Sequence, residues 1–141
     1  MSTSEFVIET DPTLEDVQYL EDRLYEFNVG ATGIADGAGL AVFVRDENRR
    51  IVAGICGNTW GGCCEIRQFW VEESRRRLGL GARLLDAAEG EARRRGCTQM
   101  VLTTFSFQAP AFYRKHGFLD LAATDDHPRG HQHLLLRKPL S

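Results

Sequence analysis

The chain has 141 residues, of which 43% are hydrophobic and 26% are charged, so we expect a single domain spanning residues 1–141 with a buried core. Its net charge of −3 argues against wholesale nucleic-acid binding. No apolar run approaches membrane-spanning length, and the first five residues lack the basic and apolar regions of a secretion signal. We therefore expect a cytoplasmic protein that binds neither nucleic acid nor a membrane.

The first third of the chain predicts a short strand, then a helix. Residues 6–9 have the composition of a strand, and Thr13 and Asp16 have the spacing of a capping box, which marks a helix start. Residues 28–30 are expected to end that helix, and residues 31–39 are expected to form a loop or a short helix. Spacings of three and four residues give the helix an apolar stripe. The stripe consists of Leu14, Val17, Leu20, Leu24 and Phe27.

Apolar segments then predict a hairpin and a third strand. Residues 40–45 and 51–57 flank a polar turn, and Gly61-Gly62 forms a second turn before the strand at residues 65–71. Side chains alternate between the two faces of a strand. Strict alternation along the third strand puts Glu65, Arg67, Phe69 and Val71 on one face, and Ile66, Gln68 and Trp70 on the other.

A segment rich in arginine and glycine, residues 75–82, joins this strand to a predicted helix over residues 79–95, which Gly96 stops. Gly79 and Gly81 have no Cβ, so a bulky anion can approach their backbone closely. The first amides of a helix and its dipole favour such an anion. The segment lacks the Gly-Lys-Ser/Thr ending of a P-loop and the three glycines of a dinucleotide fingerprint. It predicts a phosphate-binding loop, with a tight turn and solvated arginines as the alternative.

The remainder predicts a buried strand at residues 100–104, a short helix at 109–116 and two closing strands at 118–122 and 133–137. Strands before, between and after the two late helices indicate a mixed α/β (α+β) sandwich around one sheet. Four cysteines without a secretion signal do not predict disulfides, so we interpret them as packing residues. They are Cys56, Cys63, Cys64 and Cys97.

Two motifs, taken in this order and spacing, resemble the GNAT superfamily of acyl-CoA N-acyltransferases. Arg76-x-x-Gly79-x-Gly81-Ala82 is similar to its Arg/Gln-x-x-Gly-x-Gly/Ala signature, and Phe112-Tyr113-x-x-x-Gly117-Phe118 is similar to its Phe-Tyr-x-x-x-Gly-Phe signature. The resemblance covers nearly the whole chain. It implies a mixed, mostly antiparallel central sheet flanked by helices, which splays after the strand at 65–71 and holds acetyl-CoA as co-substrate in the splay.

The resemblance also implies roles for individual residues. Tyr113 stands where the family has a general acid that protonates the departing thiolate. A tyrosine of pKa near 10 is a weaker acid than a thiol near 8.5, so full transfer is uphill by about 2 kcal/mol, and a hydrogen bond that holds the sulfur is the alternative. Gln108 stands where many relatives have an asparagine that binds the pantetheine arm, and a backbone amide near Val71 is the expected oxyanion donor. The expected cofactor-binding residues are Trp70, Val71, Arg76, Arg77, Leu78, Gly79, Leu80, Gly81, Ala82, Gln108 and Phe112.

Acetyl transfer to an amine also needs a proton acceptor, because deprotonating an alkylamine at pH 7 costs roughly 4.6 kcal/mol. Glu65 is the candidate base, since it lies fourteen residues before Gly79, as the glutamate base of histone-type GNAT enzymes does. The alternative is a carboxylate at the strand end that pairs with Arg67 or solvent.

Acceptor contacts are expected from Tyr25, Asn28 and Arg67, because the first helical region walls the acceptor side in relatives. The histidines of residues 125–133 lack a fixed ligand set, so no metal is expected, and this segment is expected to shape the acceptor mouth. The sequence thus predicts an N-acetyltransferase that moves an acetyl group directly from acetyl-CoA to a primary amine of a small molecule or protein. A homodimer is compatible with the sequence, and a non-catalytic acyl-CoA-binding sensor on the same fold is the alternative.

Overall fold

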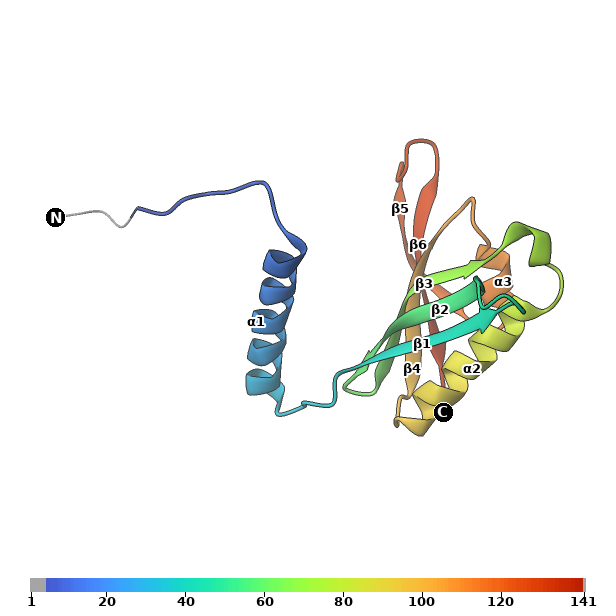
Figure 1. Cartoon of the computed structure of the whole chain (residues 1–141), viewed down its shortest axis with the longest axis horizontal. Coiled ribbons are helices and arrows are strands. Elements are labelled where there is room, and N and C mark those ends of the chain that lie inside the picture. The colour runs from blue at the N-terminus through green and yellow to red at the C-terminus, as the bar shows by residue number, and fades with distance from the viewer. Residues whose placement is uncertain (1–4, 141) are drawn as a thin grey trace. The chain divides into compact units, whose positions relative to one another are not determined.

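The computed structural model describes residues 5–140, which fall into two compact units that divide between Ala35 and Asp36 (Figure 1). The first unit contains helix α1 (Leu14–Thr32). No helix among the described residues is long and apolar enough to cross a bilayer. The second unit contains, in chain order, β1 (Ala38–Arg45), β2 (Ile51–Trp60), β3 (Cys63–Val71), a 3-10 turn (Glu73–Arg75), α2 (Leu80–Arg94), β4 (Gln99–Phe105), α3 (Pro110–Lys115), β5 (Leu119–Asp125) and β6 (Gln132–Pro139).

Helix α1 begins as predicted and ends later. The side chain of Thr13 accepts a hydrogen bond from the amide of Asp16 at 3.0 Å, and the Asp16 carboxylate accepts one from the amide of Thr13 at 3.3 Å, which completes the capping box. The helix continues through residues 28–30 because the left-handed residue that ends it is Gly33, with φ of 74°. The apolar stripe is present but exposed, with Leu20 and Phe27 both 69% accessible.

The predicted strand at residues 6–9 is wrong. No strand covers residues 5–13, and the side chains of Phe6, Val7 and Ile8 are exposed. A strand forms where a neighbouring strand satisfies its backbone groups, and the local composition of residues 6–9 says nothing about such a neighbour.

The second unit is built on one six-stranded sheet with the order β1-β2-β3-β4-β6-β5. All neighbouring strands are antiparallel except β3 and β4, which are parallel. The crossover between these two strands contains α2, as parallel neighbours require. This architecture confirms the mixed, mostly antiparallel sheet predicted from the sequence.

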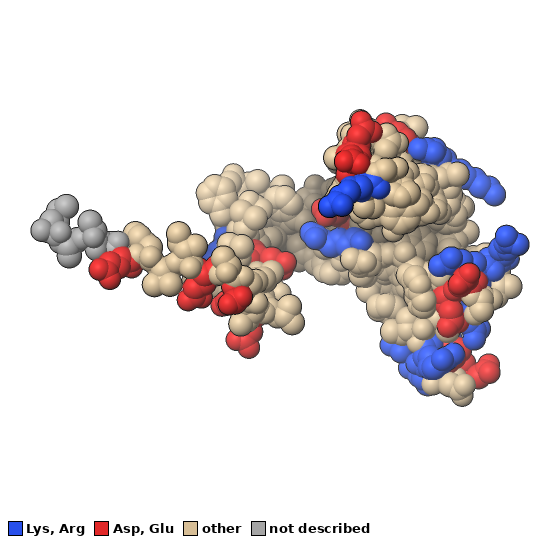
Figure 2. Space-filling model, turned by 90° about the horizontal axis from the view of Figure 1, so that it is seen from above, with Lys and Arg blue, Asp and Glu red and all other residues tan. Residues whose placement is uncertain are grey.

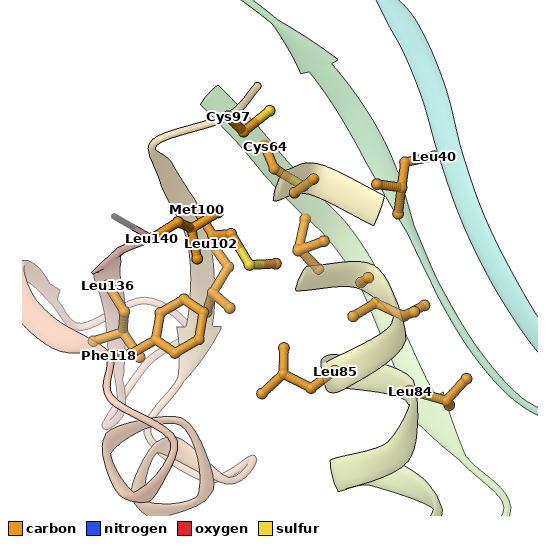
Figure 3. Packing of buried hydrophobic residues seen from close by; sticks show 14 of the residues in the cluster. Leu40, Cys64, Leu84, Leu85, Cys97, Met100, Leu102, Phe118, Leu136 and Leu140 are labelled. Carbon is orange, nitrogen blue, oxygen red and sulfur yellow. The ribbon is translucent and has the colours of Figure 1, made fainter. Parts of the chain in front are cut away.

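The core lies between α2 and one face of the sheet. Leu84, Leu85, Ala88 and Ala92 form the buried stripe of α2. Figure 3 shows Leu85 directed toward Met100 and Leu102 of β4, with Phe118 and Leu136 beside them. Burial of a side chain as large as leucine stabilises the fold by about 1.5–3 kcal/mol, so this stripe fixes α2 against the sheet.

The four cysteines are all free thiols. Cys64 and Cys97 are buried in the core (Figure 3), whereas Cys56 and Cys63 are half-buried. Burial raises the pKa of the Cys64 thiol to about 12, so this thiol remains protonated at neutral pH.

Candidate active site

The parallel strands β3 and β4 pair over a short distance and then separate. Only the partners Cys63 to Ile66 on β3 and Gln99 to Leu102 on β4 are in register, although β3 continues to Val71 and β4 to Phe105. Beyond these pairs the two strands diverge, and a cavity of about 880 Å³ occupies the gap. The family resemblance implied such a splay after the strand at residues 65–71, and the structure places its start earlier, after Ile66.

A β-bulge at Arg67 sets the side-chain directions along β3. Gln68 pairs with Cys56 of β2 and Ile66 pairs with Gly57, so Arg67 is an extra residue between two registered pairs. The bulge overturns the predicted alternation, because one extra residue reverses the faces beyond it.

Ile66 therefore faces the core together with Phe69 and Val71, whereas Arg67 and Gln68 are both exposed. Gly57 is needed opposite the bulge, since a Cβ there would overlap the carbonyl oxygen of Glu65.

The loop after β3 leads into the start of α2 at one end of the cavity. Gly79 precedes the helix with φ of 78° and has no side chain to cap it. The first amides of α2 have no partners within the helix and, together with the helix dipole, form a site for an anion. Arg77 has φ of 71°, a left-handed conformation that is rare for a residue with a Cβ.

Arginines surround this helix start. Arg76 donates from Nε to the carbonyl of Val71 at 3.0 Å, and Arg75 donates from Nε to the carboxylate of Glu72 at 3.0 Å. Arg77 and Arg83 make no ion pair within residues 5–140, so their charge is free to attract an anion. On the face seen in Figure 2, most Lys and Arg side chains belong to the second unit, and the first unit is mainly acidic.

The cavity collects most of the residues predicted to bind the cofactor. Leu78 is the exception, because it does not line the cavity. The lining residues are Ile66, Arg67, Gln68, Phe69, Trp70, Val71, Arg75, Arg76, Arg77, Gly79, Leu80, Gly81, Ala82, Leu102, Thr103, Thr104, Phe105, Phe107, Gln108, Ala109, Phe112, Tyr113, Lys115, His116 and His133.

Tyr113 is on α3 and lines the cavity where the splay meets the core. Its ring packs edge-on against Phe69 at 6.1 Å between centroids and against Phe118 at 5.7 Å. Burial raises the pKa of Tyr113 to about 12. The hydroxyl is therefore a weaker acid than an exposed tyrosine, and it remains a hydrogen-bond donor throughout the neutral range.

Gln108 uses its side-chain oxygen within the protein. This atom accepts hydrogen bonds from the Thr104 hydroxyl at 2.9 Å and from the Phe105 amide at 2.8 Å, which closes the turn between β4 and α3. The amide nitrogen of the side chain has two donor hydrogens. A contact from Gln108 to a bound ligand would thus use these donors.

Glu65 and Arg67, the predicted base and acceptor contact, lie at the bulge. Arg67 lines the cavity and donates from Nε to the side chain of Asn58 at 3.0 Å. Glu65 does not line the cavity, and its carboxylate, 49% exposed, pairs with Arg67 at 3.4 Å. The observed contacts match the alternative interpretation of Glu65 as a surface carboxylate. Tyr25 and Asn28 belong to α1, in the other unit, so their role stays a prediction.

Lys115 and His116 line the cavity although neither was predicted as a site residue, and His133, which also lines it, belongs to the segment 125–133 that was expected to shape the acceptor mouth. Lys115 and His116 fall inside the second motif, between Tyr113 and Gly117, where the motif leaves residue type open. His133 was placed on a closing strand, and the strand pairing that brings it to the cavity joins it to Phe105 of β4. Within the described part of the chain, no group of His, Cys, Asp or Glu has the arrangement of a metal site.

The acetyltransferase (GNAT) family model matches residues 5–118. The chain belongs to the acetyltransferase (GNAT) family. Its sequence is 28% identical over 118 residues to an acetyltransferase of Agrobacterium fabrum, covering 84% of this chain and 86% of that protein. It is 33% identical over 100 residues to the blasticidin-S acetyltransferase of Streptomyces morookaense, covering 70% of this chain and 74% of that protein.

Two solved acetyltransferases share the fold along almost their whole length. A crystal structure from Bacillus cereus is 31% identical, with a TM-score of 0.81 over 95% of this chain and 98% of that one. Another, from Agrobacterium tumefaciens, is 26% identical, with a TM-score of 0.87 over 96% of this chain and 99% of that one. GNAT membership makes the protein an acyltransferase of the acetyl-transferring kind, and the cavity at the splay is its candidate active site.

Proposed function

We propose that the protein transfers an acetyl group directly from acetyl-CoA to a primary amine. The observation that supports this proposal is the single cavity that runs from the anion site at the start of α2, through the splay of β3 and β4, to the hydroxyl of Tyr113. Acetyl-CoA has a charged pyrophosphate at one end and a thioester at the other, and the cavity offers an environment suited to each.

The pyrophosphate is proposed to bind at Gly79 and Gly81, next to Arg76 and Arg77. A helix N-terminus favours a phosphate through its free amides and its dipole, and arginine adds hydrogen bonds to phosphate oxygens. The amide-containing arm then lies in the splay, where the edges of β3 and β4 that face each other lack strand partners beyond Ile66 and Leu102. Backbone groups at such edges pair readily with an extended chain of amides.

Chemistry takes place beside Tyr113. The amine nitrogen attacks the thioester carbonyl, the carbon–sulfur bond breaks, and the amine loses a proton, so that amide and free thiol result. Full proton transfer from Tyr113, with pKa of about 12, to a thiolate near 8.5 is uphill by about 5 kcal/mol. We therefore assign Tyr113 as a hydrogen-bond donor to the departing sulfur.

For the acceptor we propose a small molecule with a primary amine. The name of the Streptomyces relative, a blasticidin-S acetyltransferase, indicates the small molecule blasticidin S as its acceptor. A protein amine is the second candidate, and a panel of acceptors distinguishes the two.

Binding of acetyl-CoA is tested first, by thermal unfolding. Ligand at 100 times its Kd stabilises a folded protein by about 2.7 kcal/mol, which for a chain of this size raises Tm by roughly 10 °C. Gly81→Glu should abolish the shift by placing a carboxylate at the anion site. The added Cβ itself fits, because it meets Phe112 at an ordinary contact distance of 3.5 Å, so the loss would come from the rest of the side chain and its charge. Gly90→Glu on the same helix, where a Cβ meets nothing within 4 Å, should retain it. No shift with millimolar acetyl-CoA would rule out the proposal.

Turnover is tested by thiol release with blasticidin S, nourseothricin, an aminoglycoside and a peptide with a free N-terminus, each product being verified by mass spectrometry. Amine-dependent release with an acetylated product supports the transferase. A thermal shift without release from any amine would support the alternative, a non-catalytic acyl-CoA sensor.

A further inference from the structure

The cavity wall contains few groups that can take a proton from an amine. Among its described lining residues there is no Asp or Glu. Arginine stays protonated at all working pH values, and lysine is normally charged at neutral pH. Tyr113 holds its own proton up to a pH of about 12. Two side chains that can accept a proton at neutral pH remain, His116 and His133.

The two histidines belong to different elements of the cavity wall. His116 on α3 packs at a tilt of 49° against Phe112 with 4.6 Å between centroids, and Phe112 lies against Gly81 at the start of α2. This places His116 at the end proposed for the pyrophosphate. His133 pairs with Phe105 on β4, beyond the point where β3 and β4 separate, and thus lies on the far arm of the splay.

We propose that His133 accepts the proton of the acceptor amine during acetyl transfer. The inference rests on the proposed acetyltransferase function and adds the catalytic base to it. As the amine nitrogen bonds to the thioester carbon, its acidity rises, and the imidazole takes the proton. The carbon–sulfur bond then breaks and the thiolate leaves while hydrogen-bonded to Tyr113. The imidazolium returns its proton to solvent and the thiolate takes one up, so amine and thioester give amide and thiol.

Aromatic packing fixes the imidazole of His133. It stacks on Phe105 with 4.5 Å between centroids and 29° between planes, and His127 lies edge-on to it at 5.0 Å. Phe105 is itself tied down, because its amide donates to the side-chain oxygen of Gln108 at 2.8 Å. The side chain of Gln108 therefore positions the ring on which the proposed base stacks.

The charged groups near His133 are few. On the hairpin, Asp125 accepts a hydrogen bond from the side chain of Gln132 at 2.8 Å, and Asp126 accepts one from the amide of Gly130 at 2.8 Å. Arg129 lies in the same turn, and Arg67, which pairs with Glu65 on the same strand, lines the cavity from β3. His127 is the titratable ring in direct contact with His133, so the test includes variants that separate the histidines.

The experiment measures kcat/KM against pH with the fastest amine of the panel. Wild-type protein should show an inflection between pH 5 and 8, where histidine normally titrates. His133→Gln should remove the inflection and lower kcat/KM by roughly 10²–10⁴-fold at pH 7.5, the usual contribution of a general base. His133→Phe keeps a ring to stack on Phe105 and should be equally impaired.

Each of the other possible results of this experiment has a single interpretation. Activity in His133→Phe near the wild-type level would overturn the proposal and leave a stacking role. Loss of the inflection in His127→Gln, His116→Gln or Glu65→Gln, with retention in His133→Gln, would assign the base elsewhere. Wild-type protein that binds acetyl-CoA but acetylates no amine of the panel would overturn the proposed function and the base with it. All variants should keep the thermal shift with acetyl-CoA, which shows that they fold and bind the donor.

Discussion

Removal of the Tyr113 hydroxyl tests the chemistry most directly. Tyr113→Phe keeps the ring that packs on Phe69, Phe112 and Phe118, so the change deletes one oxygen and its hydrogen bond. A hydrogen bond to a charged partner such as a thiolate contributes about 1.5–3 kcal/mol, which corresponds to a fall in kcat of roughly 10- to 150-fold. A proton-donating role would be uphill by about 5 kcal/mol, because the pKa of Tyr113 is raised to about 12.

The assay is thiol release at saturating acetyl-CoA from pH 7 to 10.5, for wild type and Tyr113→Phe in parallel. The pKa of Tyr113 is raised, so the donor stays protonated over this whole range, and the ratio of the two kcat values should be independent of pH. The KM for acetyl-CoA should change little, because the bond strengthens only as negative charge develops on sulfur. Equal kcat values for the two proteins, or a ratio that collapses toward one between pH 8 and 10, would refute this reasoning.

Two further substitutions probe the loop and the bulge. Arg77→Gly removes a cation from the anion site and relieves a left-handed conformation at φ of 71°. We therefore expect a nearly unchanged Tm and binding of acetyl-CoA that is about 10-fold weaker, as measured by the Kd from calorimetry. An unchanged Kd would show that Arg77 does not contribute to the anion site. Gly57→Ala should lower the free energy of unfolding in urea by about 2–3 kcal/mol, because the added Cβ overlaps the Glu65 carbonyl. The control Gly39→Ala, whose added Cβ meets no atom within 4 Å, should change that free energy by less than about 0.5 kcal/mol, as a surface substitution does. Equal effects of the two substitutions would contradict the packing argument.

Local signals predicted much of this architecture. The capping box at Thr13 and Asp16 requires only contacts within a few residues of each other and is present as predicted, and α2 (Leu80–Arg94) lies within the helix predicted over residues 79–95. The end of α1 was misplaced because Gly30 and Gly33 both offer the flexibility of a helix terminator, and only Gly33 adopts the left-handed conformation.

Which residues line the cavity depends on contacts between strands that are distant in sequence, and such contacts cannot be inferred from the sequence alone. The bulge at Arg67 arises from how β3 aligns with β2, so strict alternation predicted the wrong face for Ile66. Glu65 had the spacing expected of a base, but the carboxylate lies outside the cavity lining. His133 reaches the cavity because β6 pairs with β4, a pairing that skips β5, and its neighbours in sequence give no sign of it.

The short parallel pairing of β3 with β4 has a mechanical consequence. Four registered pairs join the three strands β1, β2 and β3 to the three strands β4, β6 and β5, and α2 packs across both sets, with its Glu89 paired with Lys138 of β6 at 2.5 Å. The sheet thus consists of two three-stranded halves that are joined by a short, buried strand pairing, with Cys64 and Met100 at its centre and fully buried. A molecule bound in the gap contacts both halves of the sheet and restricts their movement relative to each other. Amide hydrogen exchange should therefore slow on both sides of the gap when the donor binds, including on strands that never contact it.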